Sequence, residues 1–245
     1  MIYKNLIINI KIWNKLEKMY HSKKIPHALL FHGPKGNGKE GHAIEFSSLL
    51  NYKTKADLEK IKLFQHPNIE LITPLPKEKT INKNSNALNA LSHKSLEQYI
   101  DLKKQKMLNP YQKIKFKKRS TILINSIRDI KKNIHYRNAE RNRIYLIFEA
   151  EKLCYPKNEP GNALLKILEE PPPNTIFILV TSNKEKILDT ILSRCCEFYY
   201  PKLTEHQIIQ YLKNNHYQCD NINLLIKLCD NDLNLILEMI EEEID

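Results

Sequence analysis

The chain is 245 residues long, with 42% hydrophobic and 27% charged residues, a balance that is ordinary for a soluble globular protein. No apolar run approaches the ~20 residues that a membrane-spanning helix requires, and Lys and Asn interrupt the N-terminal apolar residues, unlike those of a secretory signal peptide. We therefore expect a cytoplasmic protein with no membrane partner. The formal net charge of +11 favours phosphate-rich partners such as DNA, although a Lys- and Asn-rich composition from an AT-rich genome would give the same charge.

Short apolar runs alternate with helical patterns as far as Pro201, which predicts an α/β fold with a largely parallel sheet. The stretch IKIWNKLEKMY near the N-terminus is a predicted helix. A predicted buried strand at 28–31 leads directly into a glycine-rich loop, and a helix at 39–50 follows it. Further strands are predicted at 69–72, 143–148, 176–181 and 196–200.

The region between Pro74 and Ser120 has a different character. Residues 74–94 are polar and low in apolar periodicity, which predicts a loop or an insertion. Residues 103–119, called the basic segment below, gather cationic residues around Tyr111 and Phe116: Lys103, Lys104, Lys106, Lys113, Lys115, Lys117, Lys118 and Arg119. This segment fits two interpretations. It either follows a nucleic-acid backbone, with the aromatic rings stacking on bases, or forms a solvated basic helix and loop.

After Pro201 the pattern is helical only, with short amphipathic helices predicted around 206–215, 222–229 and 232–243. The chain therefore divides into an α/β domain at 1–202 and a small all-α domain at 203–245. The second domain is too small to bury a core alone, so we expect it to pack on the first.

The sequence GPKGNGKE, residues 33–40, has the G-x-x-x-x-G-K spacing of a phosphate-binding loop (P-loop), with glycines at Gly33, Gly36 and Gly38. Between a strand and a helix, such a loop wraps backbone N–H groups around phosphates, and Lys39 would reach the β- and γ-phosphates. The next residue is ordinarily Ser or Thr, whose hydroxyl binds Mg²⁺, but here it is Glu40. Glu40 could ligate Mg²⁺ itself, yet its charge would repel a triphosphate, and we expect repulsion to dominate.

The second magnesium ligand of such sites is an Asp at the end of a buried strand. In the strand IYLIFEAEKL, Phe148 occupies that position, and Glu149 remains in the place of the water-activating carboxylate. A phenyl ring cannot coordinate a metal. Two losses from one metal site predict a degenerate nucleotide site that holds no metal.

Two longer motifs carry a family resemblance. The sequence NALLKILEEPP at 162–172 and the triplet SRC at 193–195 resemble the clamp-loader branch of the AAA+ ATPases, which includes the delta-prime and gamma/tau subunits of bacterial DNA polymerase III. IPHALLFHGP at 25–34 is also similar. The resemblance covers most of residues 1–240. It implies a P-loop AAA+ domain at 1–202, with helices flanking a parallel sheet, followed by a helical lid domain at 203–245.

The resemblance also implies roles for single residues. Arg194 matches the arginine finger that points into a neighbouring subunit's ATP site, where a planar, permanently charged guanidinium fits phosphate oxygens. The alternative is an arginine that closes a helix by pairing with a local carboxylate. Ser182 aligns with the polar sensor of the γ-phosphate, although it could equally cap the next helix. Asn234 stands where the lid of the family places an arginine that contacts the nucleotide.

These departures follow a pattern, because Glu40, Phe148 and Asn234 replace groups that act on the chain's own ATP, whereas Arg194 would act on a neighbour's. The resemblance therefore implies a non-hydrolysing subunit of delta-prime type, without intrinsic ATPase activity, within a DNA-directed DNA polymerase holoenzyme. It would brace the loader ring and supply Arg194 in trans during sliding-clamp loading. Two alternatives stay open: a weakly active ATPase of gamma/tau type that uses Glu40 as a Mg²⁺ ligand and Glu149 as a base, and a nucleic-acid-binding protein that uses the basic segment.

The implied partners are the gamma/tau and delta subunits, the sliding clamp, and primer-template DNA in the assembled complex. We expect no required cofactor, with residual ATP or ADP binding left open. Many relatives carry a four-cysteine zinc module after the P-loop helix, but residues 41–119 contain no cysteine, so no zinc is expected. We expect reduced thiols at the five cysteines, Cys154, Cys195, Cys196, Cys219 and Cys229. The family's third, collar domain is expected to be absent from a chain ending at Asp245, either as a fragment or as a reduced subunit.

Overall fold

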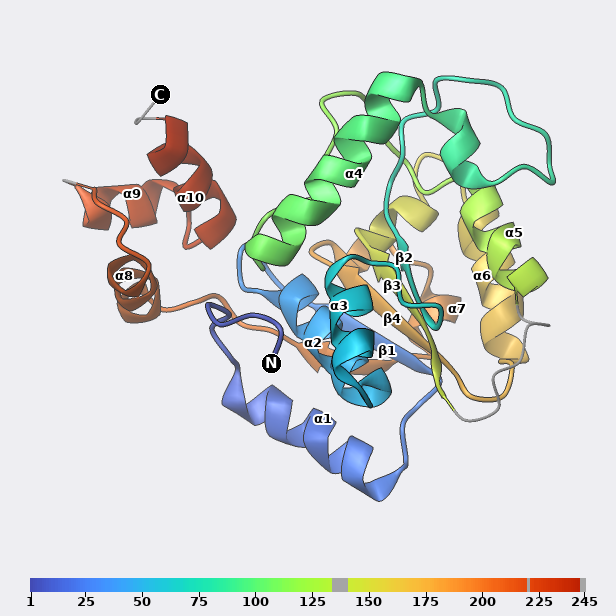
Figure 1. Ribbon diagram of the computed structural model, residues 1–245, viewed down its shortest axis with the longest axis horizontal. Coiled ribbons are helices and arrows are strands. Elements are labelled where there is room, and N and C mark those ends of the chain that lie inside the picture. The colour runs from blue at the N-terminus through green and yellow to red at the C-terminus, as the bar shows by residue number, and fades with distance from the viewer. Residues whose placement is uncertain (134–140, 220, 243–245) are drawn as a thin grey trace.

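The computed structural model describes residues 1–133, 141–219 and 221–242 (Figure 1), so residues 220 and 243–245 of the predicted lid domain lie outside the described part. The predicted α/β fold is confirmed. A five-stranded parallel sheet has the order β2-β3-β4-β1-β5. Each of the five strands begins and ends within one residue of its predicted bounds: β1 (Ala28–His32), β2 (Ile69–Ile72), β3 (Arg143–Phe148), β4 (Thr175–Thr181) and β5 (Cys196–Tyr199).

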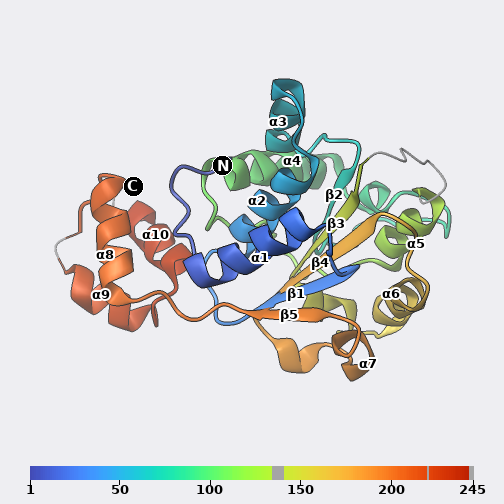
Figure 2. The same ribbon diagram turned by 90° about the horizontal axis from the view of Figure 1, so that it is seen from below.

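Helices cover both faces of this sheet (Figure 2). One face carries α1 (Ile10–Ser22), α2 (Lys39–Asn51) and α3 (Lys55–Lys62), and the other carries α5 (Ile124–Asn133), α6 (Glu159–Glu169) and α7 (Asp189–Leu192). Strand residues alternate between two cores, so that Leu29 and Phe31 pack with the first group of helices while Leu30 packs with the second. Burial on both faces explains why these strands are continuously apolar in sequence.

Residues 75–121 form an insertion whose two ends meet. The backbone N–H of Leu75 donates to the Thr121 carbonyl at 2.9 Å, and the Thr121 N–H donates back at 3.2 Å. The insertion contains a short 3₁₀ helix, η1 (Ala87–Ala90), and α4 (His93–Leu108). It also has most of a small core of its own, made of Leu75, Ala87, Ala90, Leu91, Tyr99, Ile114, Phe116 and Leu123. The prediction of a loop over 74–94 missed η1 and the start of α4, because few apolar residues mark them.

The C-terminal part is helical, as predicted, with α8 (Glu205–Asn214), α9 (Ile222–Leu228) and α10 (Leu233–Glu242) grouped at one end of the molecule (Figure 1). Their buried residues, among them Tyr211 and Ile236, belong to the same core cluster as Leu16 and Phe31. The lid therefore packs on the α/β part, and the domain boundary at 202/203 stays a prediction. Two further 3₁₀ helices are η2 (Ala150–Leu153) and η3 (Lys184–Lys186). Within the described residues, we find no helix with the length and apolarity needed to cross a membrane.

Candidate functional site: a degenerate nucleotide cleft

The P-loop joins β1 to α2, as the sequence predicts. Gly33, Gly36 and Gly38 have φ angles of +137°, +69° and +79°, in the left-handed region that favours glycine. The P-loop packs against and hydrogen-bonds to Tyr200, the residue that follows β5. A Cβ atom on Gly33 would lie 2.1 Å from the carbonyl oxygen of Tyr200, and the Asn37 amide donates to the same oxygen at 2.8 Å. The glycine spacing thus produces a loop of the expected shape and position.

Lys39 is buried at the start of α2, and its ammonium group bonds to its own loop. Nζ donates to the Pro34 carbonyl at 2.5 Å and to Asn37 Oδ1 at 3.0 Å. Burial, and then the charge of Lys113, lower the pKa of Lys39 to about 7. Two of the three N–H groups of the ammonium that would reach phosphates in a working site are therefore bonded to its own loop.

Glu40 is buried next to Lys39, and two lysines of the basic segment hold both of its carboxylate oxygens. Lys106 Nζ donates to Oε2 at 2.6 Å, and Lys113 Nζ donates to Oε1. Burial alone would raise the pKa of Glu40, but the charges of Lys106 and Lys113 outweigh burial and lower the pKa to about 2. Glu40 is therefore an ionised side chain that is neutralised internally, and a metal ion would have to displace a lysine to reach it.

The basic segment differs from both of its predicted interpretations. Tyr111 and Phe116 are 2% and 5% exposed, so their rings are not available for stacking on bases. Lys106 is 0% exposed, so the segment is not a fully solvated helix and loop either. The physical reason is the buried carboxylate of Glu40, which draws two lysines inward. The exposed cations of the segment are Lys104, Lys115, Lys117, Lys118 and Arg119.

Strand β3 ends at Phe148, which is buried, and the chain then turns sharply. Glu149 has a left-handed φ of +50°, and its carboxylate pairs with Lys152 at 2.9 Å. Sequence reasoning missed Glu151, two residues further on. Buried Glu151 accepts hydrogen bonds from the Thr181 hydroxyl at 2.6 Å and from the Asn183 amide at 3.1 Å, and its charge acts on Lys39. No signal in the sequence separates these two glutamates, because the turn at Glu149 decides which of them faces the loop.

The two remaining predicted contacts to the chain's own nucleotide lie on β4 and on the lid. His32 pairs in register with Thr181, so Gly33 and Ser182 follow at the same edge of the sheet. Within the described part of the chain, the Ser182 hydroxyl makes no hydrogen bond, whereas Thr181 and Asn183 both bind Glu151. Asn234 donates to Glu238 along its own helix at 2.8 Å.

Arg194 lies at the opposite edge of the sheet from the P-loop. It follows α7 and precedes β5, whose first residue Cys196 pairs with Leu29 near the start of β1, whereas the P-loop follows the end of β1. Figure 2 shows α7 and the lid helices at opposite ends of the sheet. The Arg194 side chain therefore cannot serve the chain's own loop.

The Arg194 guanidinium is one-third exposed and makes two contacts. It donates to the Thr190 carbonyl at 2.8 Å and to Glu169 at 3.1 Å, and the exposed fractions of the Arg194 and Glu169 side chains are 34% and 46%. Pairing with a local carboxylate, the alternative raised from the sequence, thus occurs in the isolated chain. An exposed ion pair contributes only about 0–1 kcal/mol, so Arg194 can exchange this partner at little cost.

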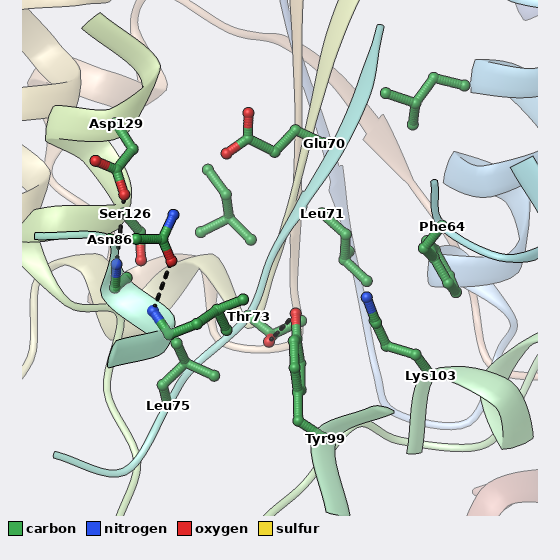
Figure 3. A pocket seen from close by; sticks show the side chains of 14 residues that line it. Phe64, Glu70, Leu71, Thr73, Leu75, Asn86, Tyr99, Lys103, Ser126 and Asp129 are labelled. Carbon is green, nitrogen blue, oxygen red and sulfur yellow. Dashed lines mark hydrogen bonds between the residues drawn. The ribbon is translucent and has the colours of Figure 1, made fainter. Parts of the chain in front are cut away.

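A cavity of about 190 Å³ lies beside the edge strand β2 (Figure 3), away from these residues. Figure 3 shows Glu70, Lys103 and Asp129 around it, and the Tyr99 hydroxyl lies 3.4 Å from that of Thr73. None of the predicted site residues lines it. A search of the described residues finds no group of three or more His, Cys, Asp or Glu that could hold a metal. The expected lack of a zinc requirement stays a prediction.

Sequence comparisons place this geometry among replication proteins. The family model described as "DNA polymerase III, delta subunit" matches residues 8–204. The tau subunit of DNA polymerase III from Bacillus subtilis is 29% identical over 199 residues, which cover 81% of this chain and 29% of that protein. The gamma subunit from Buchnera aphidicola subsp. Schizaphis graminum is 44% identical over 92 residues, which cover 37% of this chain and 24% of that protein. The chain therefore spans less than a third of the length of these curated relatives.

Two solved structures share the fold. A gamma subunit-related protein of DNA polymerase III from Thermotoga maritima superposes with a TM-score of 0.50 and 15% identity, covering 92% of this chain and 57% of that one. A RuvB variant from Thermotoga maritima gives a TM-score of 0.53 with 11% identity, covering 96% of this chain and 59% of that one. At these identities the likeness concerns the fold alone, and it confirms the predicted AAA+ type of α/β domain.

Proposed function

Because this chain belongs to the DNA polymerase III, delta subunit family, we propose that it is a clamp-loader subunit of delta-prime type, which does not hydrolyse ATP and supplies Arg194 to a neighbouring ATPase subunit. The observation that carries the proposal is the capture of Glu40 by Lys106 and Lys113. In hydrolysing relatives this position provides a hydroxyl to Mg²⁺. Here lysines engage both carboxylate oxygens, so this position offers no free ligand to the metal on which phosphoryl transfer depends.

The alternative is a weakly active ATPase motor, and similarity to proteins named gamma and tau speaks for it. That function requires Glu40 to act as a Mg²⁺ ligand and Glu149 to activate water. Glu40 would have to leave two lysines, and Glu149 would have to leave Lys152 and reverse its left-handed turn. Two separate rearrangements make the motor the weaker candidate.

The role in trans rests on the position of Arg194. This side chain lies at the edge of the sheet opposite its own P-loop, and it is held only by exposed contacts. A guanidinium so placed can act only on a nucleotide that another subunit holds. Its planar fork suits the charge that develops on a transferred phosphoryl group.

The partners follow from the same proposal. They are the gamma/tau and delta subunits and the sliding clamp, with primer-template DNA in the assembled loader. The chain needs no cofactor of its own for this role, because bracing the ring and presenting Arg194 require no bound nucleotide.

The test measures DNA- and clamp-stimulated ATP hydrolysis by the cognate gamma/tau-type subunit and its delta partner. It compares this chain with its Arg194→Ala variant, uses Arg119→Ala as a matched exposed-arginine control, and takes this chain alone as the blank. We expect Arg194→Ala to lower turnover by ~10³-fold at the site it serves, and less in total where other sites keep their own fingers. Equal rates for Arg194→Ala and the wild type, or ATP turnover in the blank, would contradict the proposal.

A further inference from the structure

We infer that residues 106–113, called the plug segment below, act as a built-in ligand of the chain's own nucleotide cleft, with the Lys106 ammonium in the place of the metal ion. The inference rests on the proposed loss of ATP hydrolysis at this cleft and adds what fills the cleft instead. It also assigns a second role to the plug segment, in which Tyr111 joins the α/β core to the lid.

The surroundings of the Lys106 ammonium resemble those of a bound cation. Its three N–H groups are used in full, by Glu40 Oε2 at 2.6 Å and by the carbonyl oxygens of Pro110 and Gln112, each at 2.8 Å. The same ammonium lies 5.7 Å from the centre of the Phe148 ring, within the range of a cation–π contact. Three oxygen atoms and one aromatic face thus surround a fully buried positive charge.

The two residues on either side of this ammonium stand at the metal-ligand positions of a P-loop site. Hydrolysing relatives hold Mg²⁺ between the residue after the P-loop lysine and an Asp at the end of another strand of the sheet. In this chain those positions are Glu40 and Phe148, and both contact Lys106. A carboxylate at the first position balances the single charge of an ammonium. A phenyl ring at the second position accepts no hydrogen bond of this kind, so the remaining N–H groups of Lys106 are free to donate to the carbonyls of Pro110 and Gln112. The two substitutions are therefore complementary to one lysine and are not independent losses.

The middle of the plug segment lies on the start of the P-loop helix. A Cβ atom on Gly41 would lie 3.0 Å from Pro110 Cβ, and a Cβ atom on Gly38 would lie 3.4 Å from the Tyr111 ring. Leu6 lies closer still to both positions, at 2.9 Å, so the plug segment and the N-terminal segment together cover Gly38 and Gly41.

Tyr111 then connects three parts of the chain. Its hydroxyl accepts a hydrogen bond from the Ile7 N–H at 2.9 Å, and its ring packs edge-on against Tyr211 of α8, with the ring centres 5.2 Å apart. The lid also contacts the P-loop directly at Gly36, where a Cβ atom would lie 2.3 Å from Asp232 Oδ1 and 2.4 Å from the Leu233 nitrogen. The P-loop, the N-terminal segment and the lid are therefore joined by direct contacts.

The charge of the cleft is also balanced from within. The ammonium groups of Lys39, Lys106 and Lys113 lie within electrostatic range of four carboxylates, those of Glu40, Glu149, Glu151 and Asp232. An entering triphosphate would meet carboxylates that repel it, while Lys106 and Lys113 are already paired with Glu40 and Lys39 is bonded to its own loop. It follows that ATP and ADP leave the relative position of core and lid unchanged.

The first test is hydrogen–deuterium exchange of the full chain, comparing Tyr111→Ala with Tyr99→Ala. Both tyrosines belong to the insertion and are buried, but Tyr99 packs on Phe116 and contacts Thr73, away from the cleft (Figure 3). We expect Tyr111→Ala to speed exchange in α8 and in the P-loop by at least about tenfold, and Tyr99→Ala to speed it within the insertion only. The same exchange pattern in both variants would overturn the inference.

The second test is direct titration with mant-ATP and Mg²⁺. The wild-type chain should show no saturable binding up to about 1 mM, and the mant-nucleotide should leave exchange in α8 unchanged. The Glu40→Ser/Lys106→Ala variant, which removes the ammonium and restores a hydroxyl, should bind at least about tenfold more tightly. Saturable wild-type binding that protects α8 would refute a filled cleft.

Two features keep these tests decisive. If Tyr111→Ala does not fold, Tyr111→Phe removes only the bond from the Ile7 N–H, and it should speed exchange in the N-terminal segment. The assay of Arg194→Ala reports on a neighbour's site and not on this cleft. If Arg194→Ala supports ATP hydrolysis at the wild-type rate, the proposed role in trans is wrong and the inference about the plug segment stands. If the wild-type chain binds mant-ATP saturably, the inference about the plug segment is wrong and the role in trans stands.

Discussion

The nucleotide cleft and the Arg194 corner serve one chemistry in the clamp-loader family, yet they are built in opposite ways here. In the cleft, Glu40 is buried and its carboxylate binds Lys106 and Lys113, which lie 66 and 73 residues away in the chain. Lys106 is buried too, and it also donates to the nearby carbonyls of Pro110 and Gln112. At the corner, the Arg194 side chain is one-third exposed and donates to the Thr190 carbonyl and to Glu169 at the surface. The difference teaches that the cleft is part of the packed interior of the protein, whereas the Arg194 guanidinium is held at the surface, where the proposed role in trans requires it.

The energetics of the two regions differ for the same reason. Removing one partner of a buried ion pair leaves an uncompensated charge and costs about 3–5 kcal/mol, whereas an exposed pair contributes about 0–1 kcal/mol. The cleft should therefore govern the stability of this chain, and the corner should govern only the activity of its neighbour. Each of the following changes tests one side of that contrast.

Lys106→Met should have the largest effect, because it leaves the Glu40 carboxylate buried with Lys113 as its remaining partner. We expect the free energy of unfolding to fall by about 3–5 kcal/mol, measured by urea denaturation. Lys103→Met is the matched control, because Lys103 is on the same helix with its ammonium over Tyr99 and makes no ion pair among the residues that the structure describes. The Glu40→Gln/Lys106→Met double variant should recover most of the loss. A loss no larger than that of Lys103→Met would contradict the role given to the buried pair.

The second-largest effect should come from acid, which lowers the free energy of unfolding by protonating Glu40. The pKa of Glu40 is lowered from an ordinary 4.5 to about 2, so the folded state holds this proton less tightly than the unfolded chain does. The stabilisation is complete above pH 4.5 and is lost as the pH falls toward 2, a loss on the order of 3 kcal/mol when complete. Urea midpoints measured from pH 6 down to pH 3 should therefore fall more steeply for the wild type than for Glu40→Gln. Parallel curves for the two proteins would show that Glu40 does not carry this dependence.

Glu169→Gln should have the smallest effect, because it removes only the exposed partner of Arg194. We expect the free energy of unfolding to change by less than about 1 kcal/mol. ATP hydrolysis by the neighbouring subunit should stay within about twofold of the wild-type rate, since Arg194 itself remains. A large loss in either measurement would show that Glu169 positions the guanidinium and that the corner is less free than its exposure indicates.

Local patterns were sufficient to predict the sheet, because its strands are buried on both faces and read as unbroken apolar runs. The P-loop was equally predictable, since its glycines and Lys39 lie within a few residues of one another. The partners of Glu40 were not. Lys106 and Lys113 lie 66 and 73 residues away in the chain, and no periodicity connects such positions.

A single backbone turn limited the rest of the site prediction. The left-handed conformation of Glu149 directs that side chain to Lys152 and brings Glu151 to Thr181. A sequence motif aligns residues by position and carries no information on such a turn. The aromatic residues of the basic segment were misjudged for a related reason, since neighbouring lysines in the sequence did not reveal that the Tyr111 and Phe116 rings face inward.

The closed ends of the insertion, where Leu75 and Thr121 pair, bear on how this cleft can change. A segment that leaves and re-enters the fold at one point can vary without disturbing the sheet, and here it supplies the lysine that pairs with Glu40. With Lys106 in place, a carboxylate at Glu40 and a ring at Phe148 are both favourable. A change of Glu40 or Lys106 alone leaves a buried charge without its partner. Single substitutions at the cleft are therefore costly, and paired changes are needed to alter it.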